Sequence, residues 1–223
     1  MNIPEKLIEL RRIMDRENIA AYIISGTDPH NSEYLPAPWQ QRKWISGFTG
    51  SYGTVVVTKN EAGLWTDTRY FIQAEKELAG SGIKLHKLRV PDAVDYPQWL
   101  VEVLESGTKV GIDGFCMSVS DVRNLKNALS PKNITIQKQI DLLGEMWFDR
   151  PALPVEKIIR LDTKYVGESA GERIGKIREF IRYNHGDAML FSCLDEIAWL
   201  YNIRCNDIAD NPVAISYAIV EKD

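Results

Sequence analysis

The sequence predicts an α/β fold in which helices pack on a sheet, built as one larger domain followed by part of a second, similar one. Three observations support this prediction. Short apolar stretches of strand length alternate with amphipathic stretches of helical period, as in α/β layered domains. Two prolines, Pro151 and Pro154, interrupt the alternation. After them the pattern restarts with a helix followed by a strand.

The first expected element is a helix that begins at Pro4. One face of this stretch is apolar, and its residues are Leu7, Leu10, Ile13 and Met14. Proline is well tolerated in a first helical turn, because the N–H group that it lacks would have no partner there. Asn18 ends the helix. Residues 19–24 are continuously apolar, which is typical of a short buried strand.

Residues 25–44 have no periodic pattern and contain several prolines, so we expect a long loop. A loop of this length in a compact domain is usually functional or packed by its own side chains. Because this one carries His30 and several aromatic residues, we expect a packed loop. Beyond it, residues 54–58 and 63–66 are expected to form two strands of a hairpin.

The rest of the first domain alternates helices with strands. A helix is expected to start near Phe71 and to stop at the glycines Gly80 and Gly82. The next expected elements are a strand at 83–88, a helix at 96–104, a strand at 109–112, a helix at 118–129 and a strand at 134–136. Ser118 is a candidate N-cap for its helix, because its hydroxyl can accept a hydrogen bond from a first-turn N–H group.

The second unit repeats this order over fewer residues. Its expected elements are an amphipathic helix at 169–181, a strand at 188–191, a core helix at 194–200 and a strand at 213–220. The apolar face of the first of these helices is expected to contain Ile174, Ile177, Phe180 and Ile181. So few elements cannot easily close a core, because small units bury too little surface. We therefore expect domains at residues 1–150 and 151–223, joined by a linker at 149–154, with the second domain incomplete.

Composition and charge exclude several classes of function. The 223 residues are 44% apolar and 26% charged, which is ordinary for a globular protein. The formal net charge of −4 gives no general attraction to nucleic acid or to an anionic membrane. The N-terminus lacks the basic start and apolar core of a secretory signal. Three widely spaced cysteines indicate reduced thiols, so we expect a cytoplasmic protein.

A phosphate-binding loop is not favoured by the glycine spacing. Gly47, Gly50 and Gly53 follow the pattern GxxGxxG and lead into a strand. A dinucleotide-binding fingerprint instead needs GxGxxG between a strand and a helix. We therefore expect a tight turn in which glycine permits positive φ.

Metal and nucleophile chemistry is not favoured either. The three histidines occur in no metal-binding spacing; they are His30, His86 and His185. No histidine is near Cys193 or Cys205, which favours free buried cysteines. The acidic pair Asp207 and Asp210 is expected to form a polar turn with side-chain capping.

The stretch of residues 65–71 is the strongest local candidate for ligand binding. It places Asp67 and Arg69 at a junction between a strand and a helix, among aromatic residues. An arginine held by a carboxylate and flanked by aromatic faces is well suited to bind a carbonyl or carboxylate group. The alternative is an internal ion pair that only fixes the turn.

Five strings of residues occur together in one known family. They are residues 30–34, 46–51, 64–71 and 147–151, and residues 194–204 with 211–213. Because they occur in the same order over essentially the whole chain, the sequence resembles the N-terminal part of three-domain Xaa-Pro aminopeptidases, of the creatinase/prolidase superfamily (peptidase family M24). The resemblance implies a creatinase-like domain, with a mixed sheet flanked by helices, followed by part of a second such domain.

The resemblance also implies an activity for the parent protein. The family comprises metallopeptidases that remove the N-terminal residue from peptides with proline in second position. Their catalytic domain, of pita-bread fold, carries two divalent metals, usually manganese, which generate a strong nucleophile from water at neutral pH. The family's two metal-binding aspartates are eleven positions apart, and no two aspartates here have that spacing. We therefore expect no catalytic residue, no metal ligand and no cofactor in this chain, and no hydrolysis by it alone.

One residue is carried over from the family by its motif. The arginine of the Trp-Thr-Asp-x-Arg-Tyr motif contacts bound peptide in the family, and it aligns with Arg69. Tyr52 stands where the family commonly has a small residue, and Thr68 where it often has glycine. Cys205 also replaces a common glycine, which would strain the backbone if its site needs positive φ.

The resemblance thus implies a non-catalytic part of the protein that contributes to the substrate entrance and to subunit contacts in a homodimer. The expected partner is a peptide with proline second, with no nucleic acid and no membrane. Two alternatives remain open. One is the N-terminal portion of a prolidase or creatinase relative, and the other is a stand-alone peptide-binding module.

Overall fold

The computed structural model describes residues 1–138 and 140–223. The chain divides into two compact units. The first comprises Met1–Pro29 and Pro38–Pro151, and the second comprises His30–Ala37 and Ala152–Asp223. The second unit therefore contains a short segment of the long loop near the N-terminus.

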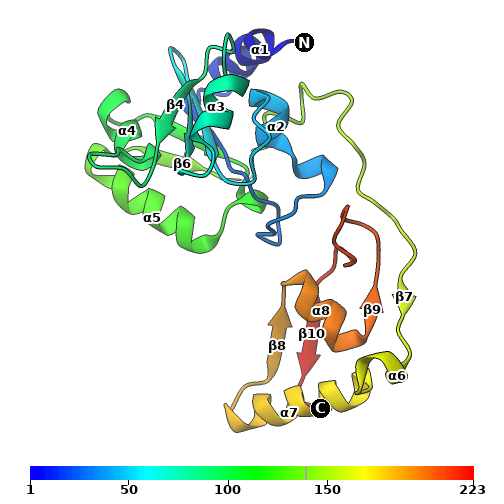
Figure 1. Ribbon diagram of the computed structural model, residues 1–223. Coiled ribbons are helices and arrows are strands. Elements are labelled where there is room, and N and C mark those ends of the chain that lie inside the picture. Colours follow the sequence, from blue (N-terminus) through cyan, green and yellow to red (C-terminus); the bar gives the residue numbers. More distant parts are fainter. Residues whose placement is uncertain (139) are drawn as a thin grey trace. The chain divides into compact units, whose positions relative to one another are not determined.

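The first unit is built on a mixed, six-stranded sheet with the order β4-β3-β2-β1-β5-β6 (Figure 1). Its strands are β1 (Ala21–Ile24), β2 (Thr54–Thr58), β3 (Ala62–Thr66), β4 (Lys84–Lys87), β5 (Lys109–Ile112) and β6 (Thr135–Gln137). β2 is antiparallel to β1 and β3, and the other neighbours pair in parallel. The carboxyl ends of all the strands except β2 therefore lie at the same edge of the sheet.

Helices cover both faces of this sheet, which confirms the predicted α/β class. They are α1 (Ile3–Arg16), α2 (Gln41–Ser46), α3 (Phe71–Glu77), α4 (Tyr96–Val103) and α5 (Val119–Leu129). Successive side chains of a strand point to opposite faces. Tyr22 and Ile24 accordingly join the buried cluster of α1, α2 and α3, whereas Ala21 and Ile23 join that of α4 and α5.

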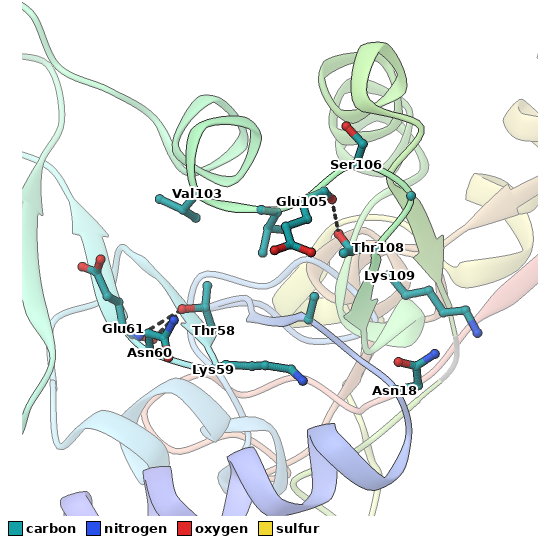
Figure 2. A pocket seen from close by; sticks show the side chains of 13 residues that line it. Asn18, Thr58, Lys59, Asn60, Glu61, Val103, Glu105, Ser106, Thr108 and Lys109 are labelled. Carbon is teal, nitrogen blue, oxygen red and sulfur yellow. Dashed lines mark hydrogen bonds between the residues drawn. The ribbon is translucent and has the colours of Figure 1, made fainter.

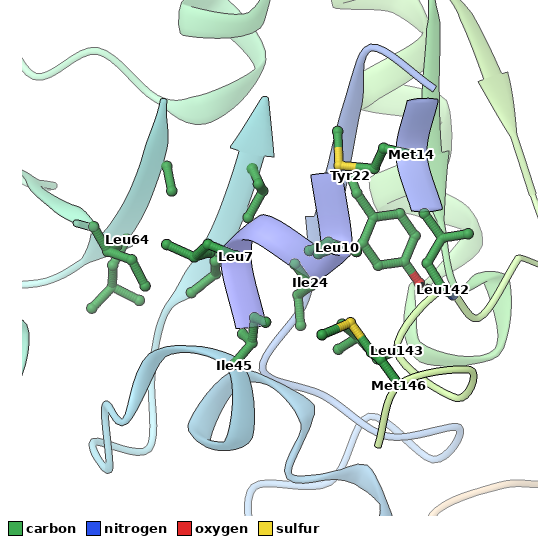
Figure 3. Packing of buried hydrophobic residues seen from close by; sticks show 14 of the residues in the cluster. Leu7, Leu10, Met14, Tyr22, Ile24, Ile45, Leu64, Leu142, Leu143 and Met146 are labelled. Atoms are coloured by element: carbon green, nitrogen blue, oxygen red, sulfur yellow. Dashed lines mark hydrogen bonds between the residues drawn. The ribbon is translucent and has the colours of Figure 1, made fainter. Parts of the chain in front are cut away.

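The helix α1 forms as predicted. Asn2 and Glu5 make a reciprocal capping box that satisfies N–H groups of the first turn. Figure 3 shows Leu7, Leu10 and Met14 of this helix packed on Ile24 and Ile45, as the apolar period requires. Ser118 likewise caps α5, since its Oγ accepts a hydrogen bond from the N–H group of Asp121 at 3.0 Å.

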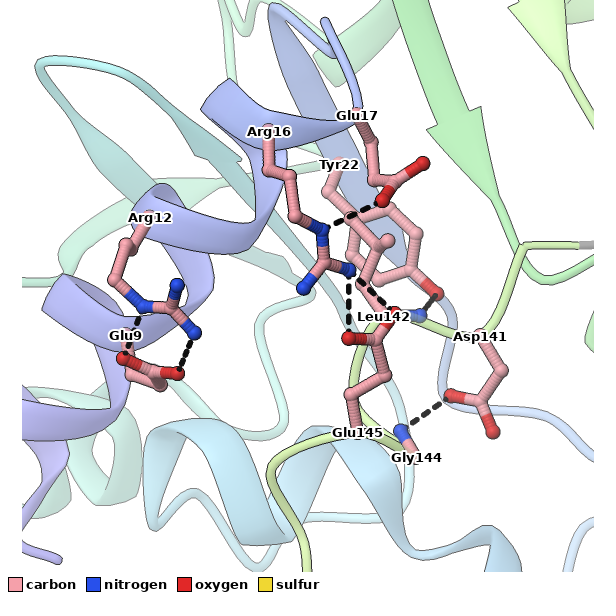
Figure 4. A network of polar contacts seen from close by, with 9 residues as sticks. All are labelled: Glu9, Arg12, Arg16, Glu17, Tyr22, Asp141, Leu142, Gly144 and Glu145. Carbon is pink, nitrogen blue, oxygen red and sulfur yellow. Dashed lines mark hydrogen bonds and ion pairs between the residues drawn. The ribbon is translucent and has the colours of Figure 1, made fainter.

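The last segment of the first unit closes the same core. Leu142, Leu143 and Met146 are buried in the cluster of α1 (Figure 3). The buried Tyr22 hydroxyl donates to the Ile140 carbonyl at 2.8 Å and accepts from the Leu142 N–H group at 3.3 Å. Figure 4 shows the hydrogen bond between Tyr22 and Leu142 beside the ion pair between Arg16 of α1 and Glu145. Side chains and backbone thus tie the end of the unit to its first strand.

The second unit contains two small antiparallel ladders. β8 (Ala188–Phe191) pairs with β10 (Ala218–Glu221), and β7 (Ile159–Arg160) pairs with β9 (Ile203–Arg204). The helices are α6 (Thr163–Val166), α7 (Ala170–Tyr183) and α8 (Leu194–Tyr201). One face of the β8–β10 ladder packs on α7 and α8 through Phe191, Ala218 and Val220.

The structure differs from the predicted elements in several places. The expected loop at 25–44 includes the start of α2, which was not predicted. The strand expected at 213–220 begins only at Ala218, because Val213 packs in the cluster of α8 instead of extending the ladder. The short elements β7, α6 and β9 were also missed.

Two side chains that were expected to be buried are exposed. Cys193 is exposed at the N-cap position of α8, where its side chain makes no capping hydrogen bond. Phe180, expected on the apolar face of its helix, is also exposed. Cys205 is buried as expected. It does not adopt positive φ, so the strain expected there is absent.

Candidate functional site

The strongest candidate site lies at the carboxyl edge of the first sheet. Ligands of open α/β sheets bind outside the carboxyl ends of the strands. Asp67 and Arg69 follow β3 there, and Arg89 follows the neighbouring strand β4. The parallel pairing of these two strands therefore brings both arginines to one place, although they are distant in sequence.

A buried carboxylate orients the first of these arginines. Asp67 is fully buried and accepts hydrogen bonds from Arg69 Nε and Nη2, each at 3.0 Å. It also accepts from the Arg69 backbone N–H group at 3.2 Å. These hydrogen bonds from Arg69 hold the pKa of the Asp67 carboxyl below its usual value, against the effect of burial. The internal ion pair considered above is therefore present, while the Arg69 side chain remains 56% exposed.

A second arginine faces the same carboxylate. Arg89 Nη1 lies 3.5 Å from Asp67 Oδ2. The guanidinium carbons of Arg69 and Arg89 each lie 5.7 Å from the centre of the Tyr52 ring, and that of Arg69 also lies 5.2 Å from the Tyr70 ring. Cation–π attraction of this kind holds guanidinium groups against aromatic faces. Asp67, Arg69, Arg89 and Tyr52 are hereafter called the arginine cluster.

The glycine run at 47–53 carries Tyr52 to this position. Gly47 ends α2 with φ of 75°, and Gly53 has φ of 153°. A Cβ atom on Gly53 would lie only 2.9 Å from the Trp65 carbonyl oxygen, so only glycine allows this approach. The Thr66 hydroxyl then donates to the Tyr52 carbonyl at 2.6 Å. The predicted turn is confirmed for Gly47 and Gly53, whereas Gly50 does not have positive φ.

A buried arginine, whose role was not predicted from the sequence, stabilises this turn by hydrogen bonds to its backbone. Arg42 of α2 donates hydrogen bonds to the carbonyl oxygens of Gly50 and Gly53. Burial lowers the pKa of its guanidinium to about 10. Its only sequence signal was a charged residue in a stretch read as loop. The backbone on either side of Tyr52 is therefore held by hydrogen bonds from the Arg42 guanidinium as well as by the steric requirements of the glycines.

The histidines lie in separate structural contexts. His30 belongs to the second unit, where its Nδ1 lies 3.0 Å from the Ser192 carbonyl oxygen and its ring stacks on Tyr217. His86 of β4 stacks on Trp65 at 4.0 Å. His185 lies in a turn with φ of 54°. Within residues 1–138 and 140–223, no three His, Cys, Asp or Glu side chains lie together where they could hold a metal ion.

The acidic loop of the second unit acts differently from the expected local cap. Asp207 accepts hydrogen bonds from the N–H groups of Glu156, at 3.2 Å, and Ile215, at 2.9 Å. Glu156 is 51 residues and Ile215 eight residues from Asp207, so this carboxylate joins the acidic loop to two other segments. The expected polar turn forms, since the Asn211 N–H group donates to the Ile208 carbonyl at 3.2 Å, but the N–H groups that Asp207 caps lie outside this turn.

A cavity of about 540 Å³ lies at the opposite edge of the first sheet (Figure 2). It is lined by the β2–β3 turn and by the segment before β5. Two of its charged side chains form ion pairs with residues outside the lining, since Lys59 pairs with Asp15 and Glu61 pairs with Lys84. Thr108 Oγ1 also donates to the Glu105 carbonyl within this lining. Several polar groups of this cavity are thus already engaged by other groups of the protein, which favours the arginine cluster as the ligand site.

None of the helices in the described ranges is both long and apolar enough to cross a membrane. This finding agrees with the absence of any long apolar stretch in the sequence.

Comparison with known proteins gives the same family for both parts of the chain. The Creatinase/Prolidase N-terminal domain family matches residues 6–143, and a second family of the same description matches residues 149–223. A probable Xaa-Pro aminopeptidase P of Coprinopsis cinerea is 39% identical over 221 residues, covering 98% of this chain and 35% of the relative. Xaa-Pro aminopeptidase 1 of Dictyostelium discoideum is 39% identical over 230 residues, covering 99% of this chain and 36% of the relative.

A solved structure is similar along the whole chain. It is an X-prolyl aminopeptidase from Caenorhabditis elegans, described as a cytosolic enzyme with a di-nuclear active site. The match has a TM-score of 0.93 and 36% sequence identity, and it covers 100% of this chain and 38% of the other. The chain thus spans about a third of the length of each of these proteins.

Proposed function

Because this chain belongs to the creatinase/prolidase N-terminal domain family, we propose that it is the N-terminal part of a metal-dependent Xaa-Pro aminopeptidase. The observation that carries the proposal is the similarity to the Caenorhabditis elegans enzyme along the entire chain, at a TM-score of 0.93. Residues 1–150 are proposed as its first creatinase-like domain and residues 151–223 as part of a second. The prolidase and creatinase alternatives have less support, since relatives at 39% identity are Xaa-Pro aminopeptidases.

The proposed reaction is hydrolysis of the bond before proline in peptides with proline second. We place its two divalent metals, proposed as manganese, outside this chain, because the described residues offer no cluster of metal ligands. The di-nuclear site of the similar enzyme supports a two-metal centre. Its description as cytosolic supports a cytoplasmic location, and subunit contacts in a homodimer are part of the same proposal.

Within this protein, Arg69 is proposed to bind the peptide at the substrate entrance. Asp67 holds two of its guanidinium nitrogens and so fixes the plane of the group, while more than half of the side chain remains exposed. A planar guanidinium fixed in this way can donate directed hydrogen bonds to a peptide carbonyl or carboxylate. Lysine cannot reproduce that geometry. The contribution of this chain is therefore binding and orientation of the substrate.

The proposal is tested with the full-length protein that contains this chain. We expect Xaa-Pro-Xaa tripeptides to be cleaved after the first residue by that protein and not by the 223-residue chain. Loss of a charge-assisted hydrogen bond costs on the order of 1.5–3 kcal/mol. Arg69→Ala and Arg69→Lys should therefore lower kcat/KM roughly ten- to a hundredfold.

Arg12→Ala is the matched control. Arg12 also forms an ion pair with a neighbouring carboxylate, Glu9, but on the exposed face of α1. It should leave the kinetics unchanged. If Arg69→Ala destabilises the protein while kcat/KM stays at its original value, Arg69 only fixes the turn. Absence of any Xaa-Pro cleavage by the metal-loaded full-length protein would refute the proposed activity itself.

A further inference from the structure

Arg89 has a backbone conformation that arginine rarely adopts. Its φ is 59°, in the left-handed region, where a Cβ atom is crowded by the backbone and glycine is favoured. The residue therefore carries a steric cost that glycine at this position would avoid. Such an outlier is a reason to ask what the side chain does.

The Arg89 side chain is presented to solvent beside the arginine cluster. It is 68% exposed, and its contacts are the Asp67 carboxylate at 3.5 Å and the Tyr52 ring at 5.7 Å. The 3.5 Å separation is longer than a guanidinium–carboxylate hydrogen bond. To the residues that the structure describes, Arg89 donates no hydrogen bond. Its donor groups thus remain available to a ligand.

The charges of the cluster point to the kind of ligand. Two guanidinium groups face one buried carboxylate, and Arg69 already binds that carboxylate through two nitrogens. Arg89 is therefore not needed to neutralise Asp67. A guanidinium presents parallel N–H donors that match a carboxylate, and the Tyr52 face limits the directions in which Arg89 can turn.

We propose that Arg89 binds the C-terminal carboxylate of a short peptide, as a second anchoring residue beside Arg69. This inference rests on the proposed function, since it names the substrate class of the same site. It adds a preference for short peptides with a free C-terminus, whose terminal carboxylate would bind the Arg89 guanidinium. The left-handed backbone at Arg89 is then retained because it directs the guanidinium toward Tyr52 and Asp67.

The first experiment compares two tripeptides that differ only in having a C-terminal carboxylate or carboxamide. The full-length protein should cleave the free acid with kcat/KM about tenfold above that of the amide. Arg89→Gln and Arg89→Gly should remove this preference by lowering kcat/KM for the acid toward the value for the amide. Arg123→Gln, which alters an exposed arginine of α5, should keep the preference. Equal acid-to-amide ratios in the unchanged protein and the Arg89 variants would overturn the inference.

The second experiment does not require activity. The arginine Nε–H signals of the 223-residue chain are followed by NMR while the N-acetylated tripeptide acid or amide is added. The Arg89 signal should shift with the acid and not with the amide. Arg89→Gly should also raise the melting temperature or leave it unchanged, because glycine relieves the left-handed backbone. An unmoved Arg89 signal, or the same shift with both peptides, would overturn the inference even if the full-length protein cleaves Xaa-Pro peptides.

Discussion

Replacement of Tyr22 by phenylalanine isolates the hydrogen bonds that close the core of the first unit. The ring is fully buried, and its hydroxyl links the Ile140 carbonyl, at 2.8 Å, with the Leu142 N–H group, at 3.3 Å. Phenylalanine keeps the ring but leaves both backbone groups without this partner. A buried polar group left unsatisfied costs about 1–3 kcal/mol. Since one of the two bonds is long, we expect a total loss of about 2–3 kcal/mol.

The assay is calorimetric unfolding of the 223-residue chain, which separates transitions of different regions. For a domain of this size, the expected loss corresponds to a decrease of roughly 5–10 °C in melting temperature. Tyr96→Phe is the control, because Tyr96 also packs its ring on Trp65 but makes no hydroxyl hydrogen bond to the described residues. It should change the melting temperature by less than about 2 °C. Equal effects of the two substitutions would refute the assigned role of the Tyr22 hydroxyl.

Two further predictions concern packing and pH. An alanine Cβ at Gly26 would lie 2.7 Å from the Gly53 carbonyl oxygen and against Arg42, so Gly26→Ala should destabilise the chain by about 1–3 kcal/mol in urea unfolding. Gly175→Ala on the open side of α7 should instead stabilise it by about 0.5–1 kcal/mol, and the reverse order would contradict the packing argument. Burial of the His86 ring, and then the nearby Lys84 charge, lowers the pKa of His86 below its usual value of 6.5. At acidic pH, His86 therefore binds more protons in the unfolded chain than in the folded chain. The free energy of unfolding should therefore fall between about pH 7.5 and about pH 5.5, and less steeply in His86→Gln; identical slopes would exclude His86 as the cause.

The parts of the fold that could be predicted are those decided by neighbouring residues. The helix α1 was readable because its cap and its apolar period are local. The helix α2 was not, because it buries the polar side chains of Gln41, Arg42 and Ser46, which a periodicity argument places outside. Gln41 donates to the Asp113 carboxylate, and Arg42 donates to backbone carbonyl oxygens of the turn that follows α2. The pattern of apolar and polar residues along the chain does not reveal these partners.

The candidate site divides in the same way. Asp67 and Arg69 are two residues apart, so their pairing followed from the sequence. Arg89 joins them only because β3 and β4 are parallel neighbours. Tyr52 was noted merely as a departure from the family pattern, and its place between two guanidinium groups depends on the turn at Gly53. Contacts made across strands were therefore the ones that sequence reasoning missed.

The inclusion of His30–Ala37 in the second unit bears on the order in which the protein is made. The Ser192 carbonyl that His30 contacts is 162 residues further along the chain. Domains generally fold from the N-terminus onward while the chain is synthesised on the ribosome. All residues of the first unit are therefore synthesised before the residues that His30–Ala37 contacts in the second unit. A cleavage at Pro151 would likewise leave part of the second unit on the N-terminal fragment. The two fragments would then have to reassociate, as in protein complementation, to restore the contacts of His30 with Ser192 and Tyr217.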